Sequence, residues 1–178
     1  MSKAVLVSIR PKWCELIATG EKTVEVRKTR PKLETPFKCY IYCTNKRPYL
    51  VWGEVFRGNW ETEFTGLYGY NRKRAEEIWD VFNGRVMGEF ICDRIDVIPP
   101  DMLLVREDRE RATSGSCLTE KELRDYLRGK QDSHNVETFP DLYCWHISDL
   151  EVYDTPEELS EFNLKRPPQS WCYVEEQI

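Results

Sequence analysis

The residues best suited to chemistry lie close together in one short segment, "GEKTVEVRK", which contains Lys22, Glu25 and Arg27. A carboxylate between two cations stays ionised and can hold both cations in fixed positions. Such a group can grip a polar ligand or polarise a bond. On the outer face of a strand it would instead form a surface ion pair of little energetic value, and the spacing taken alone favours that second interpretation.

The surrounding residues place these charges on or just before a strand. Val24 and Val26 alternate with Glu25 and Arg27, so the two valines point to one side and the two charges to the other. Lys22 would share the valine side if the strand began that early. Its direction is unconstrained if it lies in the turn before the strand.

Alternating apolar patterns predict a mainly β protein with helices (α+β). A helix with an apolar face is expected from Pro11 to a C-terminal Gly20, and another after an N-cap at Thr119. Strands are expected at 4–9, 23–28, 37–44, 49–56, 84–98, 142–154 and 169–176. Short helices are expected near 73–82 and at 155–163, the second capped by Thr155 with Pro156 at its first position. A polar loop is expected at 105–117. Many short strands without regular helical crossovers predict an antiparallel, closed or half-closed barrel.

Length and charge set the broad class. A chain of 178 residues suits one domain, and no apolar run is long enough for a membrane span or a signal peptide, so the cytoplasm is expected. Residues 1–47 hold 11 Lys/Arg against 4 Asp/Glu, whereas residues 131–178 hold 2 against 11. A basic front on an acidic body could steer an anion to one site, or folding could mix these charges over one surface.

Metal and cofactor chemistry find little support. The seven cysteines fall mostly in apolar phrases, which favours free thiols. Cys39 and Cys43 with His134 and His146 leave a zinc site conceivable, but no closely spaced ligand pair is present, and no metal or cofactor is expected. There is no GxSxG, HExxH or glycine-rich phosphate loop, and no histidine is placed to activate Cys117.

Aromatic residues are numerous and could stack bases or enclose a flat ligand. For any single one of them, a place in the core is the simpler interpretation. The aromatic residues considered are Trp13, Tyr40, Tyr42, Trp52, Trp145, Trp171 and Tyr173.

Four phrases resemble the ASCH domain family of the PUA-like superfamily: "SIRPKWCELIATGEKTVEVRK", "YIYCT", "NGRVMGEFICDRID" and "RPPQSWCYVEE". The GxKxxExR core, Gly20 to Arg27, is the most specific part. The resemblance implies a single PUA-like β-barrel domain over residues 1–178, flanked by helices, with a cleft built by the first helix and the GxKxxExR strand, and an RNA-related role. Elaborations at about 57–83 and 105–142 resemble those of phage- or prophage-borne members.

Some relatives in this superfamily are enzymes. Acetylcytidine amidohydrolases use a lysine, a threonine and a glutamate. The lysine matches Lys22, but Glu25 stands where the threonine is expected, with Thr23 nearby, which speaks against threonine-nucleophile chemistry. Relatives described as ribonucleases use Lys, Tyr and Ser side chains, for which Lys22, Tyr42 and Ser170 are the counterparts here.

The residues and the resemblance together predict an RNA- or nucleotide-binding module. The first alternative is a hydrolase acting on RNA or a modified nucleoside, with Lys22 and Glu25 as catalytic residues. The second alternative is a protein-interaction accessory that docks a protein partner through 57–83. The expected ligand-binding residues are Arg10, Lys12, Trp13, Lys22, Glu25, Arg27, Tyr42, Thr44, Trp145, Ser170 and Trp171.

Overall fold

The main sheet has six strands in a computed structural model that describes residues 2–56, 60–102, 105–127 and 140–177. The strand order is β2 (Val24–Arg27), β7 (Leu142–Glu157), β6 (Val86–Ile98), β3 (Phe37–Cys43), β1 (Lys3–Ile9) and β8 (Trp171–Glu175). β1 and β3 run parallel, and the other neighbours are antiparallel. The expected mixed, mostly β class is confirmed, and the antiparallel prediction is wrong only for β1 and β3.

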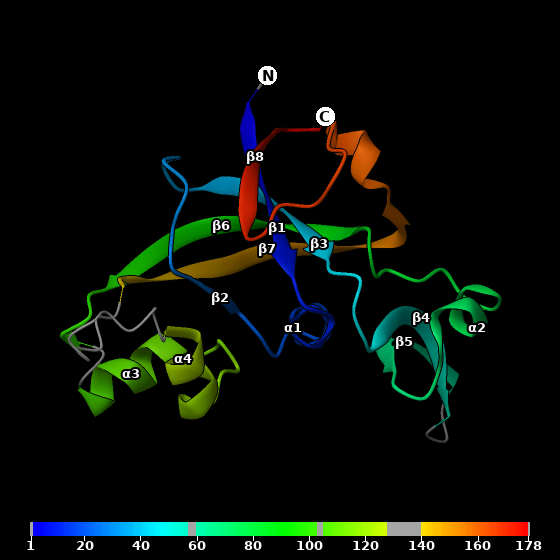
Figure 1. Cartoon of the computed structure of the whole chain (residues 1–178), viewed down its shortest axis with the longest axis horizontal. Helices are drawn as coiled ribbons and strands as arrows, with labels where there is room; N and C mark the ends of the chain where they lie inside the picture. Colours follow the sequence, from blue (N-terminus) through cyan, green and yellow to red (C-terminus); the bar gives the residue numbers. More distant parts are fainter. Residues whose placement is uncertain (1, 57–59, 103–104, 128–139, 178) are drawn as a thin grey trace, which may run out of the picture.

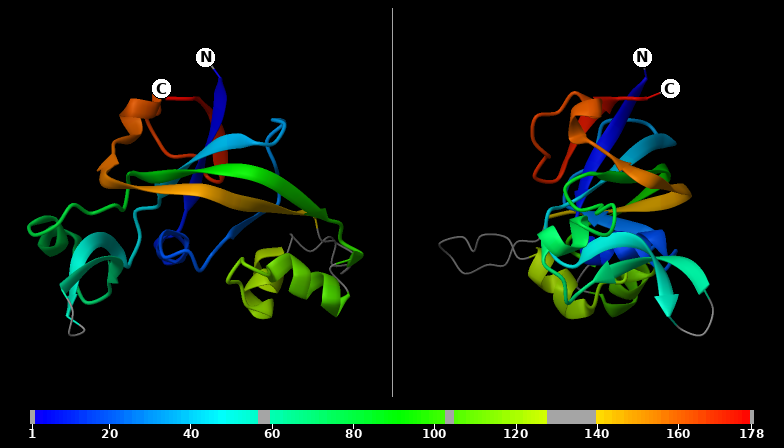
Figure 2. Two further views of the ribbon diagram at one scale, coloured as in Figure 1. Left: turned by 180° about the vertical axis from the view of Figure 1, so that it is seen from behind. Right: turned by 90° about the vertical axis from the view of Figure 1, so that its right-hand side faces the viewer.

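Smaller units lie at the two ends of this sheet. A two-stranded sheet of β4 (Tyr49–Phe56) and β5 (Trp60–Leu67) lies with α2 (Arg72–Glu76) at one end of the long strands β6 and β7 (Figure 1). Helices α3 (Arg106–Thr113) and α4 (Glu120–Leu127) lie at the other end, and α1 (Pro11–Ala18) lies between the two units. The view from behind shows the same arrangement (Figure 2).

The sheet is not closed into a barrel, so that part of the prediction is wrong. β2 and β8 are its two edges. β2 has only four residues, and the chain that follows it contains Pro31 and Pro36, which cannot donate to a ladder. A side chain spans the seam instead: the Arg27 guanidinium donates to the Ser8 carbonyl at 2.8 Å and to the Ser170 hydroxyl at 3.2 Å.

The predicted alternation of β2 is confirmed. Val24 and Val26 pack into a core cluster with Leu123 of α4 and Leu142 of β7. Glu25 and Arg27 point to the other side, where Glu25 stands opposite Trp145 in the ladder. β2 therefore separates an apolar face, covered by α4, from a charged face.

Three local predictions are wrong. Residues 105–117 are not all loop, because 106–113 form α3. This helix is highly charged and has no apolar stripe that would have predicted it. An ion pair of 2.8 Å between Arg106 and Glu110 lies along it. The segment 57–83 contains the unexpected strand β5 and a shorter helix, while 57–59 lie outside the described residues. Thr155 does not cap a helix, because β7 continues to Glu157, which pairs with Val86, and only the 3₁₀ turn η2 (Leu159–Phe162) follows.

Helix α1 connects the two end units. The Glu15 carboxylate accepts from the Gly66 backbone N–H and from the Tyr68 hydroxyl, both at 3.0 Å, which ties α1 to β5. Lys12 forms an ion pair of 2.8 Å with Glu122 of α4. Opposite charges on one short helix thus hold neighbours on both sides.

All seven cysteines are free thiols, of which only Cys117 is exposed. Within the described residues no group of three or more His, Cys, Asp or Glu side chains is arranged to hold a metal ion. His134, part of the zinc alternative, lies outside them. None of the described helices is long and apolar enough to cross a membrane.

Replacing Gly88 by alanine should destabilise the sheet. A Cβ at Gly88 would collide with the Glu151 carbonyl oxygen and lie 3.0 Å from the Val152 Cα, so β6 or β7 would have to shift. We expect a loss of about 1–3 kcal/mol in the free energy of unfolding, measured by urea denaturation. Gly69→Ala is the control, because a Cβ there meets no atom within 4 Å. Equal stability of the two variants would contradict the close approach.

The contact between α1 and α4 should depend on pH. Glu122 accepts from the Lys12 side chain and from the Thr119 backbone N–H, and these bonds lower the pKa of Glu122 from 4.5 to about 2. A lowered pKa stabilises the fold above about pH 4.5, and this contribution is lost as the pH falls toward 2. Carbon-13 NMR titration should find this low pKa, and Lys12→Met should raise it toward 4.5, whereas Lys73→Met on α2 should not. An unchanged pKa in Lys12→Met would refute the contact.

Candidate functional site

The three charged residues singled out from the sequence form one buried cluster. The Lys22 ammonium lies 3.3 Å from one Glu25 carboxylate oxygen, and the Arg27 guanidinium lies 2.9 Å from the other. The exposed fractions of Lys22, Glu25 and Arg27 are only 3%, 7% and 8%. The cluster is therefore buried rather than a surface ion pair, which the spacing alone favoured. Charges this deeply buried need partners, and each of the three has one.

Lys22 is held by backbone oxygens as well as by Glu25. Its ammonium donates to the Val24 carbonyl at 2.7 Å and to the Ser116 carbonyl at 2.8 Å. Together with Glu25, three oxygen atoms surround an ammonium that has three hydrogens. The neighbouring Gly115 carbonyl accepts from the Val24 backbone N–H at 2.9 Å. The turn before β2 is thus locked onto the loop between α3 and α4.

Arg27 extends the cluster across the open seam. Besides Glu25, it contacts the Ser8 carbonyl of β1 and the Ser170 hydroxyl just before β8. Its Nε is buried and has no acceptor among the described residues. A buried donor left without an acceptor costs about 1–3 kcal/mol, which the other contacts of Arg27 must offset.

Aromatic rings line the cluster on two sides. The Lys22 ammonium lies 5.4 Å from the centre of the Trp13 ring, within cation–π range. On the other side, Trp145 is fully buried, and its ring centre lies 6.1 Å from that of Trp171. The Trp145 Nε1 is a second buried donor without an acceptor among the described residues. Trp171 packs in turn against Tyr173, which is 41% exposed.

A basic segment runs beside these outer rings. The Trp171 indole N–H donates to the Thr29 hydroxyl at 2.9 Å, and the Lys32 backbone N–H donates to the Tyr173 hydroxyl at 2.7 Å. Between them lies the exposed Arg30. On the other side of Tyr173, the Lys3 ammonium lies 5.7 Å from the ring centre. We call Lys3, Arg30, Lys32, Trp171 and Tyr173 the aromatic–basic strip.

Most of the predicted site residues come together around β2. Successive contacts connect Trp13, Lys22, Glu25, Arg27, Ser170, Trp145 and Trp171.

Of the other four predicted residues, Lys12 lies beside this chain, with its ammonium 4.3 Å from the centre of the Trp13 ring, and the other three lie apart from it. Arg10 is the exposed residue before α1, and Lys12 is paired with Glu122. Thr44 follows β3, where its backbone N–H donates to the Ile9 carbonyl and its hydroxyl has no partner among the described residues. Tyr42 packs in the core cluster on the opposite face of β3, beside Tyr40 and Phe162, and is not brought to Glu25.

Sequence reasoning missed the backbone groups of the cluster. The Ser8 and Ser116 carbonyls hold Arg27 and Lys22, yet a carbonyl leaves no trace in residue type. Arg30 and Lys32 could have been noticed as basic residues shortly after β2, with Thr29 next to them. Their position beside Trp171 follows only from the sheet, whose edges β2 and β8 face one another across the seam.

Thiols are poor candidates for a nucleophile at this cluster. Burial, followed by the neighbouring Cys43, raises the pKa of the Cys14 thiol well above its usual value. Burial likewise raises the pKa of Cys39. A protonated buried thiol is neither a nucleophile nor a metal ligand. The arrangement can instead hold a polar group by charge-assisted hydrogen bonds beneath a stacking surface.

The fold defined by this sheet and its helices is that of ASCH proteins. An ASCH protein from Zymomonas mobilis is similar with 19% sequence identity and a TM-score of 0.57, over 97% of this chain and 88% of that chain. A serine-to-alanine variant of that protein is similar with 18% sequence identity and a TM-score of 0.60, over 97% of this chain and 89% of that chain. A tyrosine-to-phenylalanine variant is similar with 18% sequence identity and a TM-score of 0.58, over 98% of this chain and 92% of that chain. No family model and no curated protein sequence matches the chain. At this identity the similarity establishes the shared fold.

Removing the charge of Glu25 should destabilise the fold strongly. Glu25→Gln keeps the shape but leaves two buried cations without a counter-ion, and breaking such a buried pair costs about 3–5 kcal/mol. Urea denaturation measures the loss. Glu76→Gln is the matched control, because Glu76 forms an exposed ion pair of 2.6 Å with Arg72 and should lose less than about 1 kcal/mol. Equally small losses would show that water reaches Glu25 and would contradict its role as a buried counter-ion.

Proposed function

We propose that this protein binds single-stranded RNA, or a nucleotide at its end, over the seam between β2 and β8. The observation that carries the proposal is the half-buried Trp171 packed against the 41% exposed Tyr173, with the Lys3 ammonium 5.7 Å from the centre of the Tyr173 ring. A base could stack on these accessible rings next to the charged cluster. Reading of bases by stacking together with hydrogen bonds is typical of single-strand recognition.

The aromatic–basic strip supports the same proposal. Successive bases stack on aromatic rings, while cations hold the phosphates. Tyr173 is the most exposed ring of the strip, and Lys3 lies 5.7 Å from its centre. The exposed Arg30, 6.0 Å from the centre of the Tyr143 ring, and the exposed Lys32 add positive charge from the adjoining segment. Glu25 would act from below by keeping Lys22 and Arg27 oriented. Arg10, Lys12 and Thr44 would lie at the margin of the site, and Tyr42 would support it through the core.

Three finer points belong to this proposal. The chain would work as one domain in a reducing compartment such as the cytoplasm, which fits its free thiols. An affiliation with phage- or prophage-borne ASCH proteins rests on the elaborations at 57–83 and 105–142. A hydrolase using Lys22 and Glu25 is the alternative. It is disfavoured because three oxygen atoms already surround the Lys22 ammonium and leave it no free hydrogen for a substrate.

Anisotropy with a fluorescein-labelled RNA octamer of mixed sequence tests the proposal. We expect the single strand to bind more tightly than the matching duplex. The logarithm of the affinity should fall linearly with the logarithm of salt concentration, with a slope of about −1 to −3, at about 0.7 per phosphate. Tyr173→Ala should weaken binding about 5- to 150-fold, since stacking contributes about 1–3 kcal/mol per base. Tyr173→Phe keeps the ring and should retain most of the affinity.

Matched controls come from α2 and from the residue directly after β5. Tyr68→Ala removes a ring that is 69% exposed in another part of the molecule and should leave RNA binding unchanged. Arg30→Ala should weaken binding, whereas Lys73→Ala on α2 should not. No binding at low salt, or equal effects of Tyr173→Ala and Tyr68→Ala, would overturn the proposal. RNA cleavage or acetate release from acetylcytidine by the parent protein would establish the hydrolase instead.

A further inference from the structure

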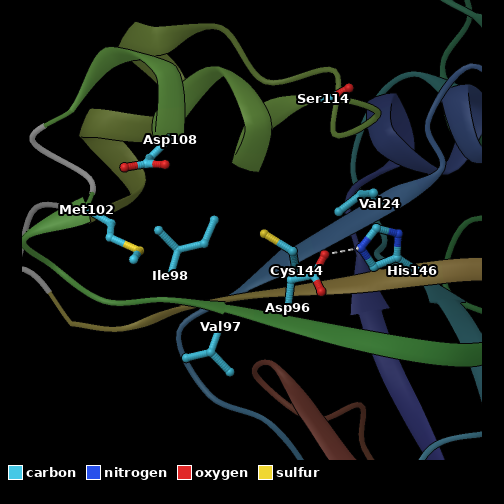
Figure 3. Close-up of a pocket in the computed structure, with 9 residues that line it drawn as sticks. All are labelled: Val24, Asp96, Val97, Ile98, Met102, Asp108, Ser114, Cys144 and His146. Carbon is cyan, nitrogen blue, oxygen red and sulfur yellow. Dashed lines mark hydrogen bonds and ion pairs between the residues drawn. The ribbon is translucent and has the colours of Figure 1, made fainter.

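A cavity of about 290 Å³ lies behind β2, on the face of the sheet opposite to Glu25 and Arg27 (Figure 3). Its floor comes from the three strands at that end of the sheet, with Val24 on β2, Ile98 on β6 and Cys144 on β7. Met102, which follows β6, adds a flexible apolar wall. Burial, followed by the charge of Asp96, raises the pKa of the Cys144 thiol to about 11, so this side chain is a neutral part of the floor.

One polar edge of the cavity is already satisfied within the protein. His146 Nε2 lies 2.8 Å from an Asp96 carboxylate oxygen. Arg94 contacts the same two residues, with its Nε 3.2 Å from Asp96 and its terminal nitrogen 3.0 Å from His146. The charge of Asp96 is therefore balanced by Arg94, and this edge has little to offer a charged ligand.

The opposite edge carries an acidic group without a counter-ion. Asp108 extends from α3 on the side of the cavity across from Ile98 (Figure 3). It has no hydrogen bond or ion pair with any described residue, although α3 carries ion pairs from Arg106 and Arg109. Ser114, just after α3, lines the cavity at its other end, near Val24 and away from Asp108 (Figure 3).

Charge and size narrow the kind of ligand. Among the described residues, the lining includes two carboxylates and no lysine or arginine, which disfavours phosphates and carboxylates. A protonated amine would complement Asp108, and an apolar body would cover Val24, Ile98 and Cys144. The volume is at the small end of ligand pockets, which suits a molecule of about one ring.

We propose that the cavity behind β2 binds a small organic amine, with the ammonium on Asp108 and the apolar body on the floor of Val24, Ile98 and Cys144. This site lies on the other face of β2 from the RNA site and does not rest on that function. RNA binding and amine binding can therefore fail separately.

Three ring compounds of nearly equal size test the chemistry: benzylamine, benzyl alcohol and benzoate. Titration of the nitrogen-15-labelled protein, followed by amide chemical shifts, gives affinity and location together. Benzylamine should bind with shifts centred on Ile98, Asp108 and Cys144. Benzyl alcohol should bind at least about tenfold more weakly, because it forms no charge-assisted bond, and benzoate should not bind. Equal affinity for all three compounds, or shifts centred elsewhere, would overturn the proposal.

Two charge-neutralising variants on the same helix separate a built site from general attraction to an acidic protein. Asp108→Asn should weaken benzylamine at least about tenfold and leave benzyl alcohol unchanged. Glu107→Gln removes an equal charge next to Asp108 but outside the cavity lining, and should change the affinity less than twofold. Equal losses in both variants would show non-specific attraction and would refute the site. Trp171→Ala, on the other face, should bind benzylamine like the parent.

Discussion

The carboxylate of Glu25, buried between Lys22 and Arg27, is the constraint on which the rest of the structure depends. Removing three charges from water is costly, and the cost is offset only when each charge meets its partners at short distance. Those partners come from the end of β1, the turn before β8 and the loop after α3. Elements that are distant in the sequence must therefore assemble together for the cluster to form.

The same short strand gives the molecule two different faces. Because side chains alternate along β2, one face carries charge toward the seam and the other carries valines toward α4 and the cavity. Only the backbone of β2 separates these two faces. Two ligands of opposite chemistry, an acidic polymer and a small amine, could thus be bound on the two sides of a single strand without sharing a side chain.

Local rules in the sequence were sufficient for part of this picture. Alternation predicted the two faces of β2, Gly20 ended α1 with its φ of +77°, and Thr119 formed a capping box with Glu122. Global features were less accessible. The open edge of the sheet depends on a strand that stops after four residues, α3 lacks an apolar stripe, and the cavity lining comes from segments as distant as Val24 and His146. Nothing in the residue types signals that two backbone carbonyls would hold Lys22.

The loop after α3 limits which deletions the fold tolerates. Its Gly115 and Ser116 carbonyls hold the backbone of β2 and the ammonium of Lys22, although the loop lies more than 90 residues away in the sequence. Deleting this loop would leave the buried Lys22 ammonium short of an acceptor. The loop and the charged cluster therefore stabilise one another, and neither is expected to keep its place in the fold without the other.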